Sequence, residues 1–457
     1  MMISMSTQGP STASLGARKY VWYRELTRYH WFVLVVAILG WMFDTMAQQL
    51  FNLARVPALR ELMGAGTPAT TVAEQAGICT CVFMIGWASG GILFGILGDR
   101  LGRAKTMMLT ILTYSIFTGL SVFSKGVLDF DAYRFLCGLG VGGQFAVGVA
   151  LVAEVVPERA RPYALGMVQA FSAVGNMTAA VVGIALGLMQ QSGSIAGAWR
   201  WEFLVGALPA PLALVVFKKL KEPEQWVKAR AEKKRMGSFA ELFSDPRWRR
   251  NSIAGLLLAF AGVVGLWGIG FFSYDLFRPV LERTFQAQGL TGSELAGKTT
   301  IWIGLTSLLQ NLGGFFGVYG YTWLSQRLNR RKAFAISFVA AMFATAYTFW
   351  NLNAISDIFW MIPLMGFTQL ALFGGYAIYL PELFPTRLRS TGTSFCYNVG
   401  RFFAAAGPFT LGMLTHDVFA GKPDPLRYAG VTMCLVFLVG LAALPFAPET
   451  KGQPLPE

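Results

Sequence analysis

The chain has 457 residues, of which 54% are hydrophobic and 14% are charged, and its mean hydropathy is +0.50. Soluble domains carry about 25% charged residues, so this composition excludes an ordinary soluble protein and indicates a membrane protein. The formal net charge of +14 would suit a nucleic-acid-binding protein, but such a protein needs a basic patch on a folded soluble face. Here the basic residues fall mainly in linkers between apolar segments.

Twelve stretches of the sequence are long and apolar enough to cross a membrane, since about 20 apolar residues span the hydrocarbon core. They lie near residues 31–54, 74–98, 106–124, 130–156, 162–190, 200–220, 252–279, 298–325, 333–353, 357–383, 391–416 and 426–446. We therefore expect an all-α membrane protein with twelve transmembrane helices. No cleavable signal precedes the first stretch, so its helix is expected to serve as the insertion signal.

The predicted helices divide into two sets of six. We expect an N-terminal bundle over residues 1–217 and a C-terminal bundle over residues 252–457, joined by a basic, helix-prone linker over residues 218–251. Most Lys and Arg residues lie on one side of the predicted helices. By the positive-inside rule that side is cytoplasmic. This predicts a multi-pass protein of the inner or plasma membrane with both termini in the cytoplasm.

The two halves repeat short patterns at a nearly constant spacing. Glu-x-x-Pro-x-Arg-x-Arg occurs at 154–161 and again at 382–389, an offset of 382 − 154 = 228. The charged loop at 99–105 returns in degraded form at 326–332, an offset of 326 − 99 = 227. A Pro-Glu pair follows each half, at 223–224 and 448–449. Such repeats indicate a duplicated membrane bundle, the architecture of secondary transporters, whose substrate site lies between the repeats.

Ionisable residues inside the predicted helices need a specific explanation. Asp44 lies in the middle of the first helix, Arg134 in the outer part of the fourth and Arg401 in the eleventh. A charge at the bilayer centre costs about 2.5–3.5 kcal/mol on insertion scales, so such residues face the bundle interior and pair. We therefore expect Asp44, Arg134 and Arg401 to face the bundle interior and to have partners there.

The loop between the second and third predicted helices carries a dense motif. It reads Gly95-x-x-x-Asp99-Arg100-x-Gly102-Arg103-x-Lys105. This pattern, at this position, resembles the loop motif of the major facilitator superfamily. The resemblance implies that the loop latches the cytoplasmic ends of the two halves, and Asp99 is suited to cap a neighbouring helix N-terminus. Because Gln326 replaces Asp99 in the second copy, the first copy is expected to carry most of the gating.

A second resemblance extends over essentially the whole chain. Arg134-x-x-x-Gly-x-Gly-x-Gly142, both Glu-x-x-Pro-x-Arg-x-Arg patterns and the tail Pro-Glu-Thr-Lys-Gly at 448–452 are similar to blocks of the sugar-porter branch. In that branch the Glu and Arg residues of these blocks form ion pairs that close the cytoplasmic face. The residues expected to form this gate here are Glu154 paired with Arg103, Glu382 paired with Arg330, and also Arg161 and Arg389.

The same branch suggests a coupling mechanism. Sugar-porter symporters that use protons pair an Asp on the first helix with an Arg on the fourth, and Asp44 and Arg134 occupy these two positions. The resemblance implies that Asp44 and Arg134 pair, and that proton binding to Asp44 releases Arg134 and couples protonation to the rocking of the two halves. The alternative is a static ion pair that only fixes packing. Sodium remains the alternative coupling ion.

The C-terminal half departs from the sugar-porter pattern where that branch holds its substrate. Gly400-Arg401 stands in place of a Gln-Trp pair, and Val264-Gly265 in place of a Gln pair. Since a guanidinium is suited to bind a carboxylate, the substrate is expected to be an organic anion. The alternative role of Arg401 is to pair with a helix end or with Asp275. The residues expected to bind substrate are Arg401, Asn398, Gln169, Asn176, Gln48, Gln310 and Asn311.

These observations predict a secondary active transporter with alternating access. It is expected to move a sialate-like or aromatic acid by proton-coupled symport, and a neutral sugar or polyol symporter, or an exporter, is the alternative. An enzyme is not expected, because His30 and His416 lie near segment ends and form no catalytic or metal-binding motif. The five cysteines are expected to be packing residues. The expected partners are the substrate, protons and the lipid bilayer, with no metal, cofactor or nucleic acid, and the chain is expected to be a monomer.

Overall fold

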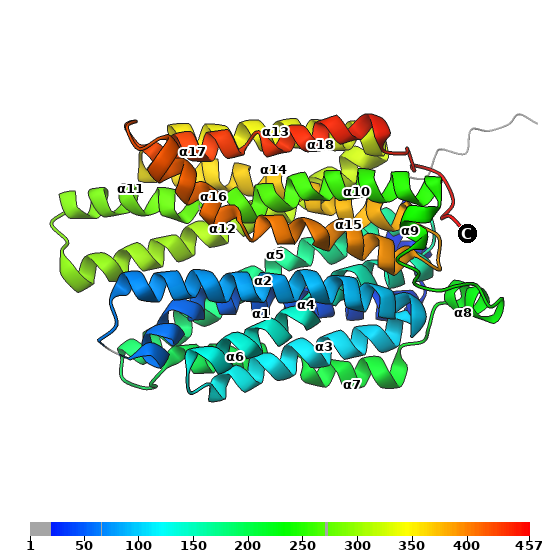
Figure 1. Cartoon of the computed structure of the whole chain (residues 1–457), viewed down its shortest axis with the longest axis horizontal. Helices are drawn as coiled ribbons and strands as arrows, with labels where there is room; N and C mark the ends of the chain where they lie inside the picture. Colours follow the sequence, from blue (N-terminus) through cyan, green and yellow to red (C-terminus); the bar gives the residue numbers. More distant parts are fainter. Residues whose placement is uncertain (1–19, 65, 270–272) are drawn as a thin grey trace, which may run out of the picture.

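The protein consists of long α-helices that run side by side along one direction (Figure 1). The computed structural model describes residues 20–64, 66–269 and 273–457. Within these ranges the structure contains helices and turns and no β-strand. The expected all-α fold is therefore confirmed.

The N-terminal half contains six crossings. Its helices are α1 (Arg28–Met63), α2 (Ala69–Arg100), α3 (Arg103–Leu120), α4 (Val127–Val155), α5 (Arg161–Gln191), α6 (Ala198–Gly206) and α7 (Ala210–Lys219). The short helices α6 and α7 are two parts of one crossing. They are interrupted at residues 207–209, where Pro209 has no N–H to donate to the helix.

The C-terminal half repeats this arrangement with more interruptions. Its helices are α10 (Pro246–Val264), α11 (Ser273–Ala287), α12 (Gly292–Arg327), α13 (Arg330–Asn351), α14 (Ile355–Glu382), α15 (Arg389–Ala404), α16 (Gly407–Met413), α17 (Pro425–Met433) and α18 (Val436–Ala443). Single π-helical turns follow α10 and α16, at Gly265–Ile269 and Leu414–Val418.

The segment between the halves forms two short helices, α8 (Glu224–Ala231) and α9 (Glu241–Ser244). The next long helix, α10, begins at Pro246, six residues before the expected start of the C-terminal bundle. Asp245 explains this earlier start, because its side chain accepts hydrogen bonds from the backbone N–H groups of Arg247 and Trp248. An Asp at the N-cap followed by Pro is a strong helix-start signal.

Eleven helical segments in the described part of the chain are long and apolar enough to cross a membrane. The stretch at 391–416 is not among them, because α15 is polar and the helix is interrupted after Ala404. The polar side chains of α15, including Arg389, Asn398 and Arg401, are buried inside the protein. We assign the twelfth crossing to α15 and α16. It can be polar because the polar side chains of α15 are buried against other helices, whereas its exposed side chains include the apolar Phe402 and Phe403.

Glycines allow pairs of helices within each half to pack closely. A Cβ atom on Gly142 of α4 would clash with the backbone of Trp87 in α2, and one on Gly317 of α12 would clash with the backbone of Phe367 in α14. Close backbone approach at small residues is the usual way in which helices associate in lipid. The α2–α4 and α12–α14 pairs therefore form equivalent tight contacts in the two halves.

The two halves meet along two seams on opposite sides of the molecular centre. Along one seam α2 packs against α15, and along the other α5 packs against α12. We call these the α2–α15 seam and the α5–α12 seam. Small apolar side chains fill much of the second one, where Ala170 and Ala173 of α5 cluster with Val318 of α12.

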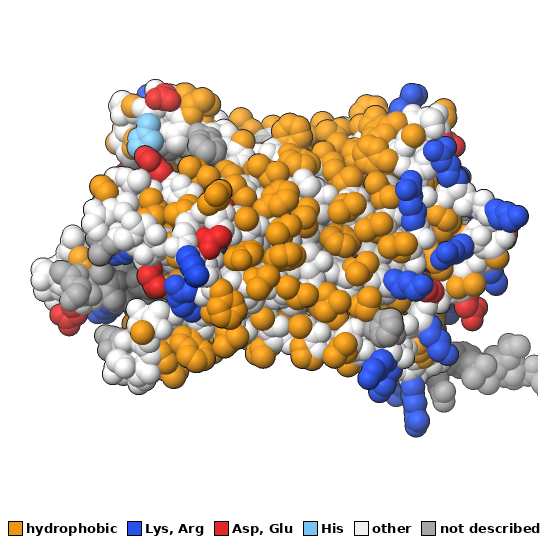
Figure 2. Space-filling view, turned by 60° about the horizontal axis from the view of Figure 1, so that its bottom comes forward, with side chains coloured by type: hydrophobic (Ala, Val, Ile, Leu, Met, Phe, Trp, Pro, Cys, Tyr) orange, Lys and Arg blue, Asp and Glu red, His pale blue; other side chains and the backbone are white. Residues whose placement is uncertain are grey.

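The outer surface has the pattern expected of a membrane-spanning protein. Figure 2 shows a broad belt of hydrophobic side chains, with Lys and Arg side chains gathered at one end of the molecule. We call this the basic end. Its exposed residues include Arg100, Lys105, Arg249, Arg331 and Lys332.

Candidate functional site

A cavity of about 90 Å³ lies between the two halves, near the middle of the helices. Most of its lining side chains are aromatic or carry an amide. The aromatic residues are Trp41, Trp87, Trp267, Phe373 and Tyr397. The amide residues are Gln48, Gln49, Gln169, Asn176, Gln310 and Asn311. Arg401 is the one cationic side chain among the described residues that line this cavity.

The guanidinium of Arg401 is held in a fixed orientation. Its Nη1 atom donates to the backbone oxygen of Tyr397 at 2.7 Å and to Oδ1 of Asn398 at 3.1 Å. Its Cζ atom lies 4.1 Å from the ring centroid of Trp87 and 4.3 Å from that of Tyr397, within the range of cation–π attraction. The Nε atom is buried and has no hydrogen-bond partner among the described residues. A planar donor group is therefore available at the cavity wall.

Asn398 was expected to bind substrate, but it does not line the cavity. Its side chain is fully buried in the α2–α15 seam, next to Gly91 of α2. The amide nitrogen donates to the backbone oxygens of Ser394, at 3.1 Å, and Gly142, at 3.4 Å. Because Oδ1 accepts from Arg401, Asn398 supports the guanidinium from behind.

Four of the six amides belong to the helices of the α5–α12 seam, whereas Arg401 belongs to α15. Asn176 of α5 donates to Asn311 of α12 through a 2.9 Å hydrogen bond that joins the two halves. Gln169 of α5 donates to Ser172 at 3.2 Å, whereas its Oε1 atom is buried without a hydrogen-bond partner among the described residues. Gln48 and Gln310, also expected from the sequence, line the same cavity.

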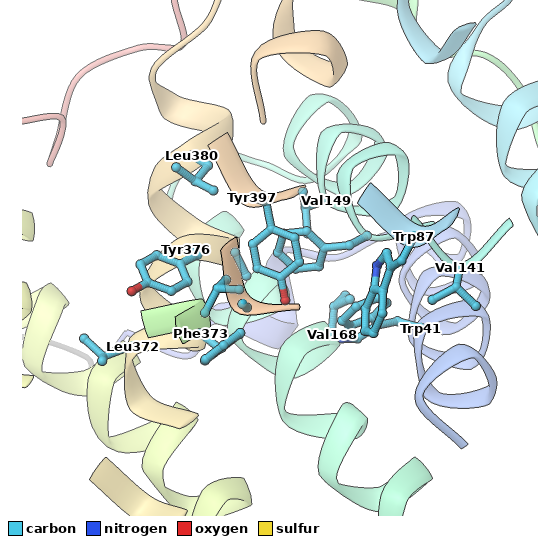
Figure 3. Close-up of a cluster of buried hydrophobic side chains, with 14 of the residues drawn as sticks. Trp41, Trp87, Val141, Val149, Val168, Leu372, Phe373, Tyr376, Leu380 and Tyr397 are labelled. Carbon is cyan, nitrogen blue, oxygen red and sulfur yellow. The ribbon is translucent and has the colours of Figure 1, made fainter. Parts of the chain in front are cut away.

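Aromatic rings from both halves line the same cavity. Figure 3 shows Tyr397 between Phe373 on one side and Trp41 and Trp87 on the other. The rings of Trp87 and Trp267 meet edge to face across the interface, with centroids 5.5 Å apart. The indole N–H groups of Trp41 and Trp87 are buried and have no hydrogen-bond partner in the described structure. The cavity therefore combines flat apolar walls with unpaired donors.

Asp44 lies beside this cavity and does not line it. Its side chain is fully buried, and neither carboxylate oxygen has a hydrogen-bond partner among the described residues. Trp41 and Gln48, three residues before it and four after it on α1, do face the cavity.

Arg134 is also fully buried, but it does not pair with Asp44 in this structure. Its Nη2 atom donates to the backbone oxygen of Phe117 at 2.9 Å and to Oγ of Ser121. Its Cζ atom lies 4.6 Å from the ring centroid of Phe203. The expected ion pair is absent because the guanidinium is directed toward the end of α3 and the aromatic side chains near it.

At the basic end, four charged residues join the two halves. Arg103 pairs with Glu154 at 2.8 Å and with Asp99 at 2.8 Å, and all three belong to the N-terminal half. Arg389, in the C-terminal half, pairs with the same Glu154 at 2.7 Å. We call Asp99, Arg103, Glu154 and Arg389 the interdomain cluster. All four side chains are fully shielded from solvent.

Asp99 makes a second link across the α2–α15 seam. Its carboxylate accepts from the backbone N–H of Ser390 at 3.1 Å, and from the backbone N–H and hydroxyl of Thr391 at 2.8 and 2.6 Å. These groups form the first turn of α15, where free N–H groups and the helix dipole favour a negative charge. Asp99 of one half thus caps a helix of the other.

The ion pair of the equivalent Arg330 and Glu382 lies within the C-terminal half. Arg330 pairs with Glu382 at 2.9 Å, and Thr450 donates to Glu382 at 2.6 Å. Gln326 occupies the place of Asp99 in the repeat, so this copy has no carboxylate to cap a helix of the opposite half. The two copies of the motif therefore make different connections.

The remaining residues expected in the gate lie close by. Gly95 faces Ser394 across the α2–α15 seam, and a Cβ atom on it would lie 2.5 Å from the Ser394 Cβ. Arg161 is buried near Arg389, Glu382 and Glu154. Arg100 is exposed and donates to the backbone oxygen of Met236 at 3.4 Å.

Gly102 accounts for the position of Glu222, a residue that the sequence did not indicate, and Glu449, noted in the sequence only as part of a repeated pattern, has the equivalent role in the other half. It has φ +113°, and its missing side chain leaves room for the carboxylate of Glu222, which accepts from the N–H groups of residues 104 and 105 at 3.2 Å. Glu449 does the same at the start of α13, accepting from Arg330 and Arg331 at 3.0 and 3.2 Å. Their offset, 449 − 222 = 227, equals that of Arg330 and Arg103. The sequence repeat did not reveal this correspondence, because the two Pro-Glu pairs are offset by 225 residues and align Glu449 with Glu224 instead of Glu222.

Two bundles with a closed ion-pair layer and a central cavity between them define a membrane transporter and not an enzyme. Residues 31–408 match the Major Facilitator Superfamily profile, and the chain belongs to this family. Its members have twelve spans, which agrees with the assignment of α15 and α16.

Individual relatives extend over nearly the full chain. A Cupriavidus pinatubonensis protein named "Probable 4-methylmuconolactone transporter" is 31% identical over 415 residues, covering 90% of this chain and 89% of the relative. The niacin transporter NiaP of Acinetobacter baylyi is 28% identical, covering 94% and 96%. The proton:xylose symporter XylE has the same fold, with a TM-score of 0.69 at 17% identity over 93% of this chain and 98% of that one.

Proposed function

We propose that this transporter carries a small organic anion together with a proton by alternating access. The observation that carries the proposal is Arg401, a cation that is 1% exposed and faces the cavity between the two halves. A buried cation costs several kcal/mol of desolvation, so it is retained where an anionic ligand compensates it. The relatives support this class, since one of them is a niacin transporter and niacin is an aromatic carboxylic acid.

A neutral sugar or polyol is the second candidate substrate. The six amides that line the cavity favour it, because amide groups can both donate to and accept from hydroxyl groups. A sugar would not require the guanidinium. Arg401 therefore distinguishes the two candidates.

Asp44 is the residue we propose to bind the coupling proton. A buried carboxyl with no hydrogen-bond partner is stable in its neutral, protonated form, since an isolated charge there would be costly. Loss of the proton would create a charge that only a cation can compensate. We propose that pairing with Arg134 belongs to this deprotonated state, and that Arg134 is held by Phe117 and Ser121 while Asp44 is protonated.

We propose that the interdomain cluster is the gate between the cavity and the basic end. It ties the halves together at the basic end and thereby closes the route from the cavity to that side. We propose that the basic end is cytoplasmic, because the positive-inside rule favours that orientation; both termini would then lie in the cytoplasm, and the bacterial relatives support an inner-membrane location. Opening the cytoplasmic route would require Glu154 to separate from Arg389 and Asp99 from α15.

Transport in proteoliposomes tests the proposed substrate class. We expect Arg401→Gln to reduce the uptake of organic acids such as nicotinate at least tenfold, because one charge-assisted pair contributes about 1.5–3 kcal/mol. Arg249→Gln, an exposed arginine at the basic end, is the matched control. If Arg401→Gln leaves organic-acid uptake unchanged, the anion proposal is wrong. If sugar uptake is found and survives the substitution, the second candidate holds.

A further inference from the structure

Building on the proposed function, we infer that Tyr114 and Ser115 of α3 are positioning residues for the proton step at Asp44. Their hydroxyl groups hold the guanidinium of Arg134 when it pairs with the deprotonated carboxylate. All four side chains are fully buried, and none of them lines the cavity between the halves. They lie inside the N-terminal half, between α1, α3 and α4.

Contacts at two levels show how α1, α3 and α4 lie against one another. At the first level, a Cβ atom on Gly40 of α1 would clash with the side chain of Gln144 of α4 and lie 3.8 Å from Cδ1 of Ile111 of α3. At the second level, Cζ of Arg134 of α4 lies 5.7 Å from the ring centroid of Phe51 of α1, and its Nη2 atom donates to the last turn of α3. Between these levels the residue numbers therefore rise along α1 and α3 and fall along α4.

Asp44 lies one turn from the first level, on the same face of α1 as Gly40. The equivalent step along α3 reaches Tyr114 and Ser115, and along α4 it reaches Gly140. A Cβ atom on Gly140 would clash with the backbone N of Tyr114, so α3 and α4 are level at this point. Asp44, Tyr114 and Ser115 thus belong to one buried layer, in which α4 contributes no side chain.

This layer contains polar oxygen atoms without partners. Both carboxylate oxygens of Asp44, Oη of Tyr114 and Oγ of Ser115 are buried and have no hydrogen-bond partner among the described residues. Two donors of Arg134, Nε and Nη1, are buried and unpaired in the same sense. Unpaired buried polar groups are costly. A guanidinium that moves into the layer would satisfy the donors and the acceptors together.

The carboxylate alone would not make a stable place for the guanidinium. A buried ion pair is stable only when further hydrogen bonds satisfy its remaining donors. Arg134 lies 140 − 134 = 6 residues from the layer, or about 9 Å along α4. An extended arginine side chain bridges most of that distance, past Thr118 and Cys137, whose Oγ1 and Sγ atoms lie 3.2 Å apart. At the layer itself the two hydroxyl groups supply the additional acceptors.

Transport of nicotinate in proteoliposomes tests this role by separating proton-driven uptake from exchange. Tyr114→Phe should slow proton-driven uptake about fivefold or more, because the deprotonated state loses a hydrogen bond to a charged group. Counterflow exchange should stay within about twofold, since exchange does not require Asp44 to release its proton. Ser115→Ala should act in the same direction, and adding it to Tyr114→Phe should enlarge the loss.

Two controls test whether the effect belongs to the proton step. Tyr321→Phe removes a hydroxyl that is equally buried and also unpaired among the described residues, but lies on α12 in the other half. It should leave both rates within about twofold. In an Asp44→Asn background, Tyr114→Phe should not slow counterflow exchange further, because the amide cannot form the ion pair with Arg134.

The inference is overturned if Tyr114→Phe leaves proton-driven uptake unchanged, or if it slows uptake and exchange equally. It is also overturned if Tyr321→Phe has the same effect as Tyr114→Phe. The proposed function fails on different results: the parent chain shows no proton-driven uptake, or Asp44→Asn retains it.

Discussion

Replacing Asp99 by alanine should shift the transporter toward the state that is open at the basic end. Asp99 accepts three hydrogen bonds from the first turn of α15, which belongs to the other half. It also pairs with Arg103, which keeps Glu154 as a second partner. The substitution therefore removes a link between the halves and leaves the N-terminal part of the interdomain cluster paired.

The size of the shift follows from these contacts. A hydrogen bond to a charged group contributes about 1.5–3 kcal/mol, and breaking a buried ionic contact costs about 3–5 kcal/mol. The three bonds exist only while the halves are closed at this end, so their loss acts on the closed state alone. Taking about 3 kcal/mol as the loss, and about 1.4 kcal/mol per factor of ten, the ratio of open to closed protein rises about 100-fold.

Accessibility labelling measures this ratio. A Ser394→Cys substitution places a thiol in the α2–α15 seam, where Ser394 is fully buried and contacts Gly91 and Gly95. We expect maleimide labelling of this thiol to become at least tenfold faster when Asp99→Ala is added. The parent chain gives the background, since its five cysteines are buried or half-buried.

A matched control distinguishes opening of the seam from general loosening. Asp357 accepts hydrogen bonds from the N–H groups of Asn353 and Ala354 at the start of α14, and these contacts lie within one half. Asp357→Ala should leave the labelling rate of the Ser394→Cys thiol within about twofold. The reasoning is refuted if Asp99→Ala also changes the rate by less than twofold, or if both substitutions accelerate it equally.

Two further predictions concern coupling and packing. Asp44→Asn should abolish accumulation driven by a proton gradient in proteoliposomes yet spare counterflow exchange, because the amide cannot bind the coupling proton; a variant that still concentrates substrate would contradict this role. Gly142→Ala should lower the stability of the purified protein by about 1–3 kcal/mol, since the added methyl overpacks the α2–α4 contact. Gly187→Ala, which has open space on α5, should not lower it, and equal melting temperatures for the two variants would argue against the close-packing explanation.

Much of the architecture could be predicted from the sequence because hydropathy and repeats report it directly. Apolar segments of membrane length indicate helices, and the returning Glu-x-x-Pro-x-Arg-x-Arg pattern identifies the two halves. The least apolar stretch, at 391–416, was assigned correctly as a crossing because it completes the second set of six. Its polarity is explained by burial of Arg389, Asn398 and Arg401 inside the protein.

The details of the site depend on three-dimensional contacts that a sequence pattern does not contain. Asp44 and Arg134 occupy the expected helices, but whether they pair depends on side-chain direction and on the state of the transporter. Trp87 was missed because a tryptophan in an apolar helix is usually a packing residue, and its contact with Arg401 lies across the seam between the halves. The supporting role of Asn398 could not be predicted either. Asn398 and Arg401 are three residues apart on α15, and the sequence does not show which of the two lines the cavity.

The unequal construction of the two seams has a consequence for the response of the protein to ionic strength. At the basic end the α2–α15 seam is fastened by Asp99, Glu154 and Arg389, whereas the α5–α12 seam is filled by Ala170, Ala173 and Val318. Once water enters, a kosmotropic salt such as sulfate screens the separated charges of the first seam and strengthens the apolar contacts of the second. A rising concentration of such a salt therefore favours an asymmetric opening, in which the halves separate at the charged α2–α15 seam and stay in contact at the apolar α5–α12 seam.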